Sequence, residues 1–162
     1  MAFRLGEKIS ALMREIYYTY NNEAIASCAM LSILQKVKSM DIARACLILP
    51  FLLDDRTIAN LKNELPVGMG LKDFIKEQQR LFVTFNKRYL ALLPVCINSL
   101  LMLRKSGQIK IEKDIIDNSS INLGVMGLGE RFASIQQAVP NFLSLFQNLS
   151  TVQLYQILKI QL

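Results

Sequence analysis

Residues 71–126 read LKDFIKEQQRLFVTFNKRYLALLPVCINSLLMLRKSGQIKIEKDIIDNSSINLGVM, and this stretch decides the predicted fold. Apolar side chains recur about every 3.6 residues from Leu71 to Tyr89, which predicts a long amphipathic helix. Pro94 suits the first turn of a second helix, because a proline at that position loses no hydrogen bond. We expect the second helix to end at Gly107, since glycine readily adopts the left-handed backbone that closes a helix.

A β-hairpin is predicted to follow the second helix. Isoleucines alternate with polar residues from Ile109 to Ile115, and residues 117–120 (Asp-Asn-Ser-Ser) have the composition of a turn. A second strand is expected over residues 121–125, which alternate in the same way. Helix, turn, helix and hairpin in this order are typical of a winged helix, a module that binds other macromolecules.

The rest of the chain reads as helices on either side of this winged-helix-like unit. Residues 1–65 are predicted to form a helical N-terminal part, which begins with an amphipathic stretch over residues 2–18. Residues 66–70 (Pro-Val-Gly-Met-Gly) have the composition of a linker, and residues 127–162 are predicted to form C-terminal helices. A chain of 162 residues can bury one good core. We therefore predict a mainly α fold in one compact domain, with the helical N-terminal part packed on the winged-helix-like unit.

The net charge of +6 comes from one window of the sequence. Residues 72–113 contain nine basic and three acidic residues, so the rest of the chain is balanced. Such clustering is expected of a surface that faces phosphate groups or an acidic protein, although a solvated helix face has the same composition. Arg88 is expected to form a structural ion pair with Glu64 or Asp73. The remaining candidates for a nucleic-acid or acidic-partner surface are Lys72, Lys76, Arg80, Lys87, Arg104 and Lys105.

The second helix has few side chains with which to read DNA. Residues 90–103 are nearly all apolar, and only Asn98 and Ser99 could reach base edges in the way that a recognition helix does. Contacts with DNA would therefore be made by lysine and arginine to phosphate, which gives no sequence specificity. We expect this apolar helix to be covered by protein.

The sequence offers no recognisable catalytic group. The chain has no histidine, so the commonest general base and metal ligand is absent. Asp54 and Asp55 are adjacent in a predicted turn, where neighbouring side chains diverge instead of converging on a metal ion. The glycine-rich residues 124–129 lack the lysine and hydroxyl residue of a phosphate-binding loop. We expect no metal site and no cofactor, and we predict that the protein is not an enzyme.

The mean hydropathy of +0.28 indicates either a membrane protein or apolar surface that a partner covers. The longest apolar run, residues 90–103, is shorter than the roughly 20 residues that cross a bilayer. No signal-peptide pattern is present. The three cysteines lie far apart without C-x-x-C spacing, which is typical of reduced, buried thiols. We expect a cytoplasmic protein that does not enter membranes.

Three parts of the sequence resemble a known family. Residues 85–94, followed by Leu100-Leu101 and by Gly107-Gln108-Ile109, are similar to an F-x-x-R…L-x-P…L-L…G-x-I/L core. Residues 47–53 resemble the apolar L-x-L-P-L-x-L run of the same family, and residues 150–160 resemble its closing S-T…I-Y-x-L-L-G-I motif. The family comprises the small middle components of three-component ABC/SMC-type bacterial defence systems, of which Lamassu is the best-known example.

The resemblance covers most of residues 20–160 and implies a non-catalytic adaptor subunit. Such a subunit would bind an SMC-like ABC ATPase and bridge it to a separate effector, often a nuclease. The complex would defend bacteria against phage or plasmid DNA, and the subunit could contact the DNA backbone within it. High apolar content and a basic window agree with this role.

Two other functions stay open at the level of the sequence. A stand-alone winged-helix transcription regulator would bind DNA through the same basic window. A protein of anionic membrane surfaces would use the same lysines, but the chain lacks a strong terminal amphipathic anchor.

Overall fold

The computed structural model describes residues 7–8, 10–11 and 20–162. The amphipathic stripe expected within residues 2–18 falls on residues outside this part of the chain. The described helices are α2 (Glu23–Val37), α3 (Ile42–Ala45), α4 (Ile48–Leu52), α5 (Asp55–Leu61), α6 (Leu71–Glu77), α7 (Gln79–Phe82), α8 (Phe85–Lys105), α9 (Glu130–Phe146), α10 (Thr151–Leu158) and the 3-10 helix η1 (Leu123–Val125). The described strands are β1 (Ser39–Met40), β2 (Ile109–Ile111) and β3 (Ile115–Asp117). The helical content with one small antiparallel sheet confirms the predicted mainly α fold class.

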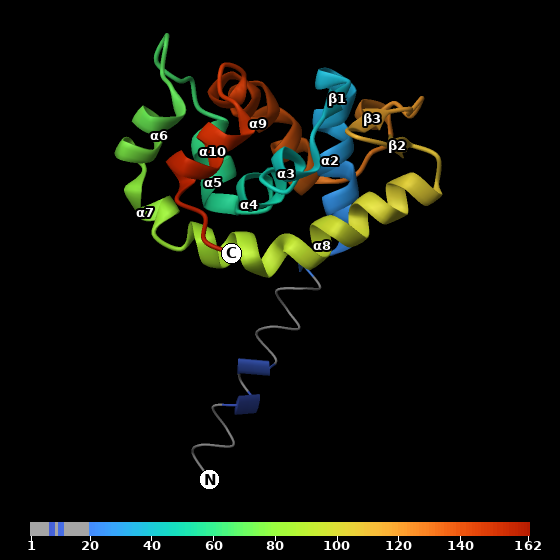
Figure 1. Ribbon diagram of the computed structural model, residues 1–162, viewed down its shortest axis with the longest axis horizontal. Coiled ribbons are helices and arrows are strands. Elements are labelled where there is room, and N and C mark those ends of the chain that lie inside the picture. The colour runs from blue at the N-terminus through green and yellow to red at the C-terminus, as the bar shows by residue number, and fades with distance from the viewer. Residues whose placement is uncertain (1–6, 9, 12–19) are drawn as a thin grey trace.

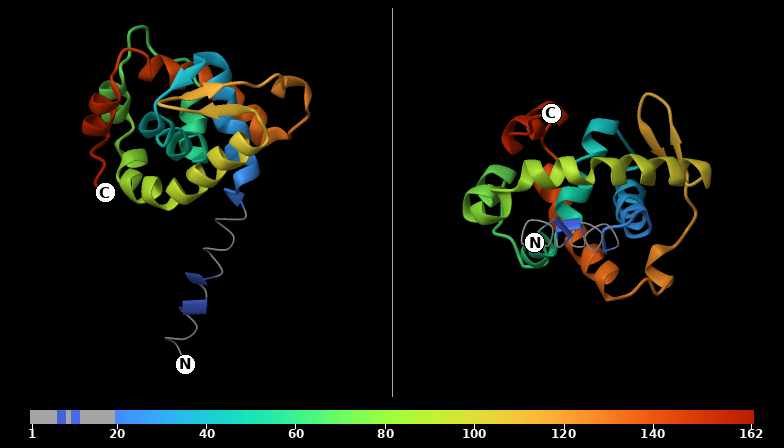
Figure 2. Two further views of the ribbon diagram at one scale, coloured as in Figure 1. Left: turned by 45° about the vertical axis from the view of Figure 1, so that its right-hand side comes forward. Right: turned by 90° about the horizontal axis from the view of Figure 1, so that it is seen from below.

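The longest described helix, α8, runs along the lower edge of the molecule in Figure 1. Helix α2 packs against α8 and also against α9, and α4 packs against both of these as well. Helix α8 therefore has one side against the body of the protein, and Figure 2 shows it crossing the underside. One continuous core contains residues from all three predicted parts of the chain.

Phe51 of α4 lies at the centre of an aromatic cluster in this core. Its ring is fully buried and meets four other rings edge-on, at centroid distances between 5.1 and 5.7 Å. Edge-to-face geometry places the positive edge of one ring against the negative face of another. The four partners come from α7, α8 and α9, and they are Phe82, Phe85, Phe142 and Phe146.

The single helix predicted from Leu71 to Tyr89 is wrong, because the structure divides it into α6, α7 and the start of α8. Gln78 breaks the first part with φ −110° and ψ 38°, and residues 83–84 separate α7 from α8. In a continuous helix, Phe74 and Phe85 would lie about 16 Å apart along the axis. The breaks instead let both rings pack on Phe82, at 6.0 and 5.6 Å. Aromatic packing thus overrides the helical pattern.

Pro94 lies inside α8 and does not begin a helix, contrary to the prediction. An internal proline costs about 3 kcal/mol, since it removes a hydrogen bond and crowds the carbonyl four residues earlier. Pro94 and Leu90 are both exposed, so the proline lies on the side of α8 away from the core, while the opposite side of α8 is buried. The predicted end of the helix is confirmed: Gly107, with φ +75°, follows α8.

The hairpin exists but has a different second strand from the one predicted. Strand β2 agrees with the first predicted strand, whereas β3 is Ile115–Asp117, so the chain turns at residues 112–114 and not at residues 117–120. Residues 121–125 are not a strand, and they include η1. The sheet has the order β1-β3-β2 with all pairs antiparallel.

Burial of Ile115 explains this register. Its side chain has no exposed surface and stands opposite Met40 of β1 and Ile111 of β2. Val125, by contrast, is 78% exposed. Strand β1 precedes residue 71, so the winged-helix-like unit does not contain its whole sheet, and the winged-helix interpretation stays a prediction.

Asp117 ties the end of β3 to the residue that follows α2. Its carboxylate accepts hydrogen bonds from the Ser119 amide and hydroxyl, at 3.1 and 2.6 Å, and from Lys38 Nζ at 3.4 Å. Burial by itself would raise the pKa of Asp117, but the bonds from Ser119 and Lys38 outweigh it and lower this pKa below its ordinary value. The folded state therefore favours the ionised carboxylate more than the unfolded state does.

We predict that Asp117→Asn lowers the free energy of unfolding by about 1 kcal/mol at pH 7, because the charge-assisted bonds weaken. A lowered pKa stabilises the fold above the unfolded value of about 3.9 and loses this effect as the pH falls through the folded value. The difference between wild type and variant should thus shrink below about pH 4. Urea unfolding across pH measures it, with the exposed Glu112→Gln as a control of equal charge change. A difference independent of pH would contradict the prediction.

Candidate protein-docking surface

The six predicted surface residues fall into two groups at opposite ends of α8. A helix rises about 1.5 Å per residue, so Lys87 and Arg104 lie about 25 Å apart along the axis. Figure 1 shows α6 and α7 beside one end of α8, far from its other end. The structure therefore brings four of the residues to one end and separates two from them. All six are exposed: Lys72 and Lys76 on α6, Arg80 on α7, and Lys87, Arg104 and Lys105 on α8.

Apolar side chains occupy the exposed side of α8 between these groups. Leu90, Pro94, Ile97 and Leu101 follow one another at intervals of four, three and four residues, so they lie on one side of the helix. Leu90, Ile97 and Leu101 are 44–48% exposed, and the adjacent Met102 is 51% exposed. We call these five residues the α8 apolar face. Side chains on the opposite side of the helix are buried in the core.

Helix α8 contains no aspartate or glutamate among its 21 residues. Lys87 lies at one end of the α8 apolar face, and Arg104 and Lys105 lie at the other. Cations in the last turn also interact favourably with the negative end of the helix dipole. The exposed side of α8 is therefore apolar in its middle and positive at both ends.

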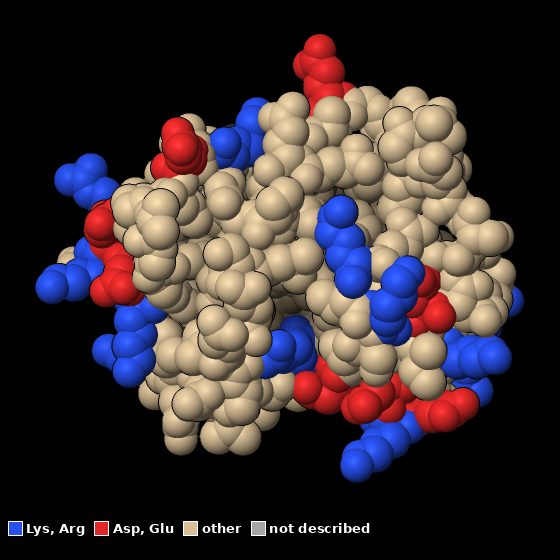
Figure 3. Space-filling view, turned by 90° about the horizontal axis from the view of Figure 1, so that it is seen from above, with Lys and Arg blue, Asp and Glu red and all other residues tan. Residues whose placement is uncertain are grey.

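The view from above shows a different distribution of charge. Figure 3 shows broad uncharged areas, with several lysine or arginine side chains near the middle of this face and acidic residues mostly toward the margin. Both signs of charge occur side by side there. Basic and acidic side chains thus both occur on this face, whereas α8 contains no acidic residue.

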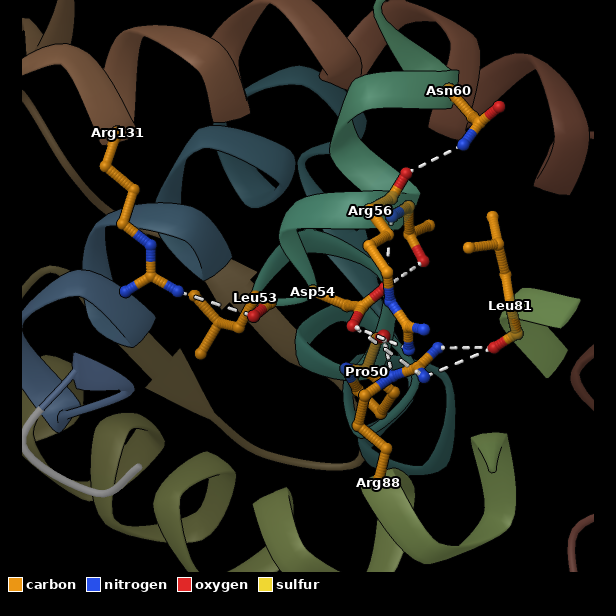
Figure 4. Close-up of polar contacts among 9 residues, drawn as sticks. Pro50, Leu53, Asp54, Arg56, Asn60, Leu81, Arg88 and Arg131 are labelled. Atoms are coloured by element: carbon orange, nitrogen blue, oxygen red, sulfur yellow. Dashed lines mark hydrogen bonds and ion pairs between the residues drawn. The ribbon is translucent and has the colours of Figure 1, made fainter. Parts of the chain in front are cut away.

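Arg88 holds the first part of α8 against the body of the protein (Figure 4). Its Nε donates to the Pro50 carbonyl at 2.8 Å, and both terminal nitrogens donate to the Leu81 carbonyl at 3.2 Å. The acidic partner is Asp54, at 3.9 Å, so the pairing predicted with Glu64 or Asp73 is wrong. The Arg88 side chain is only 9% exposed, and its contacts are with the fold and not with a ligand.

The adjacent carboxylates of Asp54 and Asp55 diverge, as expected. Asp54 caps the N-terminus of α5 and accepts hydrogen bonds from the Thr57 amide and hydroxyl at 3.0 and 2.7 Å. Asp55 instead accepts a hydrogen bond from the Tyr20 hydroxyl at 2.9 Å and pairs with Arg131 at 3.6 Å. Across residues 7–8, 10–11 and 20–162, no group of three or more His, Cys, Asp or Glu side chains could hold a metal ion.

The two candidate base-reading residues of α8 are engaged with α2. Ser99 is fully buried, and its hydroxyl donates to the Glu23 carbonyl at 3.5 Å. The Asn98 amide donates to the Glu23 carboxylate at 3.1 Å. The structure therefore withdraws Ser99 from any contact with DNA, while Asn98 stays exposed but its amide is hydrogen-bonded to α2.

The cysteines are free thiols, and two of the three are buried as predicted. Cys46 and Cys96 are buried, whereas Cys28 is only half-buried. Burial raises the pKa of the Cys28 thiol. A hydrogen bond with Cys46, together with burial, raises the pKa of Cys96 as well. Neither thiol is thus poised as a nucleophile, since the reactive form of cysteine is the thiolate.

No helix in the described part of the chain has both the length and the apolar character needed to cross a membrane. Apolar surface on α8 therefore calls for an explanation other than a membrane span.

A family model describes the class of protein to which this chain belongs. The model of the ABC-three component (ABC-3C) system Middle Component 3 matches residues 10–162. The chain is thus a member of this family of middle components, which confirms the resemblance at that level. The more specific likeness to Lamassu and to SMC-type systems stays a prediction. No curated protein and no solved structure matches the chain.

We predict that Arg88→Lys lowers the free energy of unfolding by about 2 kcal/mol or more. A lysine has one point charge in place of the planar group that reaches two carbonyls, so buried acceptors lose their partner. Thermal and urea unfolding measure the change. The neighbouring Lys87→Ala, at an exposed position, should stay within about 0.5 kcal/mol of wild type. Equal effects of the two substitutions would contradict a structural role for Arg88.

Proposed function

We propose that the protein is a non-catalytic adaptor of an ABC-three component system that defends bacteria against phage or plasmid DNA. In this role it binds the ABC ATPase component in the cytoplasm and bridges it to an effector, of nuclease type. The observation that carries the proposal is the family match over residues 10–162. A middle component of a system with three components needs surfaces for its protein partners.

The α8 apolar face supports this role on physical grounds. Burial of apolar surface contributes about 25 cal/mol per Å² removed from water. Contiguous exposed apolar patches in a protein often mark binding sites for other proteins. Helix α8 places such a patch on the longest described helix, where a partner can reach it without rearrangement of the core.

Co-expression of the chain with the other two components of its system tests the proposal. We expect the three proteins to copurify in fixed stoichiometry, and the chain alone to be poorly soluble because its apolar surface is uncovered. Size-exclusion chromatography with light scattering measures both. A monodisperse monomer that does not copurify with either component would contradict the adaptor role.

The basic residues on α6 and α7 favour a second contact, with the DNA backbone, inside the complex. Three basic side chains, Lys72, Lys76 and Arg80, are exposed at one end of the molecule, next to the exposed Asp73 and Glu77. Lysine and arginine at such a surface neutralise phosphates and release counterions, so binding depends strongly on salt. This contact positions DNA without reading its sequence.

We predict that the double substitution Lys76→Glu and Arg80→Glu abolishes defence and weakens duplex binding by the complex about tenfold or more at low salt, without unfolding the subunit. The slope of the logarithm of affinity against the logarithm of salt concentration should decrease in the variant. Circular dichroism checks the fold, and Lys110→Glu with Lys113→Glu is the control. Unchanged affinity and defence would contradict the contact. Nanomolar, sequence-specific binding by the isolated chain would instead favour a stand-alone transcription regulator.

A further inference from the structure

We propose that the α8 apolar face binds one amphipathic helix of a partner component, and that acidic residues lie at both ends of that helix's apolar stripe. The inference rests on the proposed function and adds the site and the chemistry of the partner. Three features of α8 carry it: the spacing of its exposed apolar residues, the position of its charges, and its length.

The spacing of the apolar residues fits a partner helix. Intervals of four, three and four residues from Leu90 to Leu101 are those of a seam along which two helices pack. An amphipathic helix recognised in this way places its anchors at the same spacing. The seam starts beyond Asn86, because the Asn86 side chain accepts a hydrogen bond from the Gln161 amide at 2.8 Å and the C-terminal segment lies there.

The charges define the ends of the partner helix. Lys87 supplies the exposed cation at one end of α8. The neighbouring Arg88 does not, because its side chain points inward to the Pro50 and Leu81 carbonyls. Arg104 and Lys105 are exposed at the other end. Glu23 of α2 lies beside the middle of α8, where its carboxylate already accepts a hydrogen bond from Asn98. Acidic residues of a partner helix about 17 residues apart, or about 25 Å, would meet both ends.

The same charges disfavour the other occupants. In a second copy of this chain, α8 would also present cations at both ends and no carboxylate, so parallel and antiparallel pairing both bring like charges together. A nucleic acid would meet the basic ends but would leave the apolar middle uncovered. An amphipathic helix with acidic residues at both ends would pair with the cations at the ends of α8 and would also cover the α8 apolar face.

Site-specific photocrosslinking in the three-component complex identifies the occupant. A benzophenone amino acid is introduced at Ile97, in the middle of the α8 apolar face, and at Val125, which is exposed on η1, as the control. We expect the Ile97 probe to label one segment of another component, whose sequence is an amphipathic helix with acidic ends, and the Val125 probe not to label it. Labelling of a second copy of this chain, of DNA, of a segment without acidic ends or of nothing would overturn the inference.

Substitutions test the energetic role of the same residues. Ile97→Glu should weaken copurification about tenfold or more, because it places a charge in the apolar seam. Lys87→Glu together with Arg104→Glu should weaken it about three- to tenfold, with the loss reduced at high salt. Val125→Glu and Lys113→Glu are the matched controls and should bind as wild type does. Circular dichroism and thermal unfolding confirm that each variant folds.

The outcomes separate this inference from the proposed function. If the wild-type chain does not copurify with either component, the adaptor role itself is wrong. If the wild type copurifies and Ile97→Glu does so equally well, the adaptor role stands and the α8 apolar face is not its docking site.

Discussion

The guanidinium group of Arg88 is the contact on which the placement of α8 depends. It is nearly buried and donates to carbonyls on α4 and α7, close to the Asp54 carboxylate that caps the N-terminus of α5. A buried charge is tolerated only when it is paired and hydrogen-bonded, so these partners must stay in place together. Through this one side chain, the start of α8 is attached to three other helices.

The aromatic cluster around Phe51 and this polar contact act on the same end of α8. Phe85, three residues before Arg88, packs on Phe51 at 5.1 Å, and the Arg88 guanidinium also lies 5.2 Å from the centre of the Phe85 ring. Once this end is anchored, the buried side of the helix follows from the helical period. The α8 apolar face is then left outside, because the two sides of one helix cannot both face the core.

The sequence predicted much of the candidate site but not its division. The exposure of the six basic residues and the apolar character of residues 90–103 follow from local pattern. Their separation into two groups does not, since it depends on α8 continuing through Pro94. The sequence also could not predict the acidic partner of Arg88, because Asp54 lies 34 positions away in the chain and no spacing rule connects the two residues. The second strand of the hairpin differs from the predicted one for a similar reason, because Ile115 of β3 pairs with Met40 of β1, which is distant in the sequence.

The sequence by itself determined the mainly α class, the absence of histidine chemistry, the end of α8 at Gly107 and the family, since these depend on local periodicity, composition and ordered motifs. Tertiary structure alone decided where the predicted helix from Leu71 breaks, which strand pairs with β2, and which side of α8 stays exposed. The physical reason is that ring packing, ion pairing and strand pairing join residues far apart in the chain. Their combined energy exceeds the local preferences of a proline or a helical stripe.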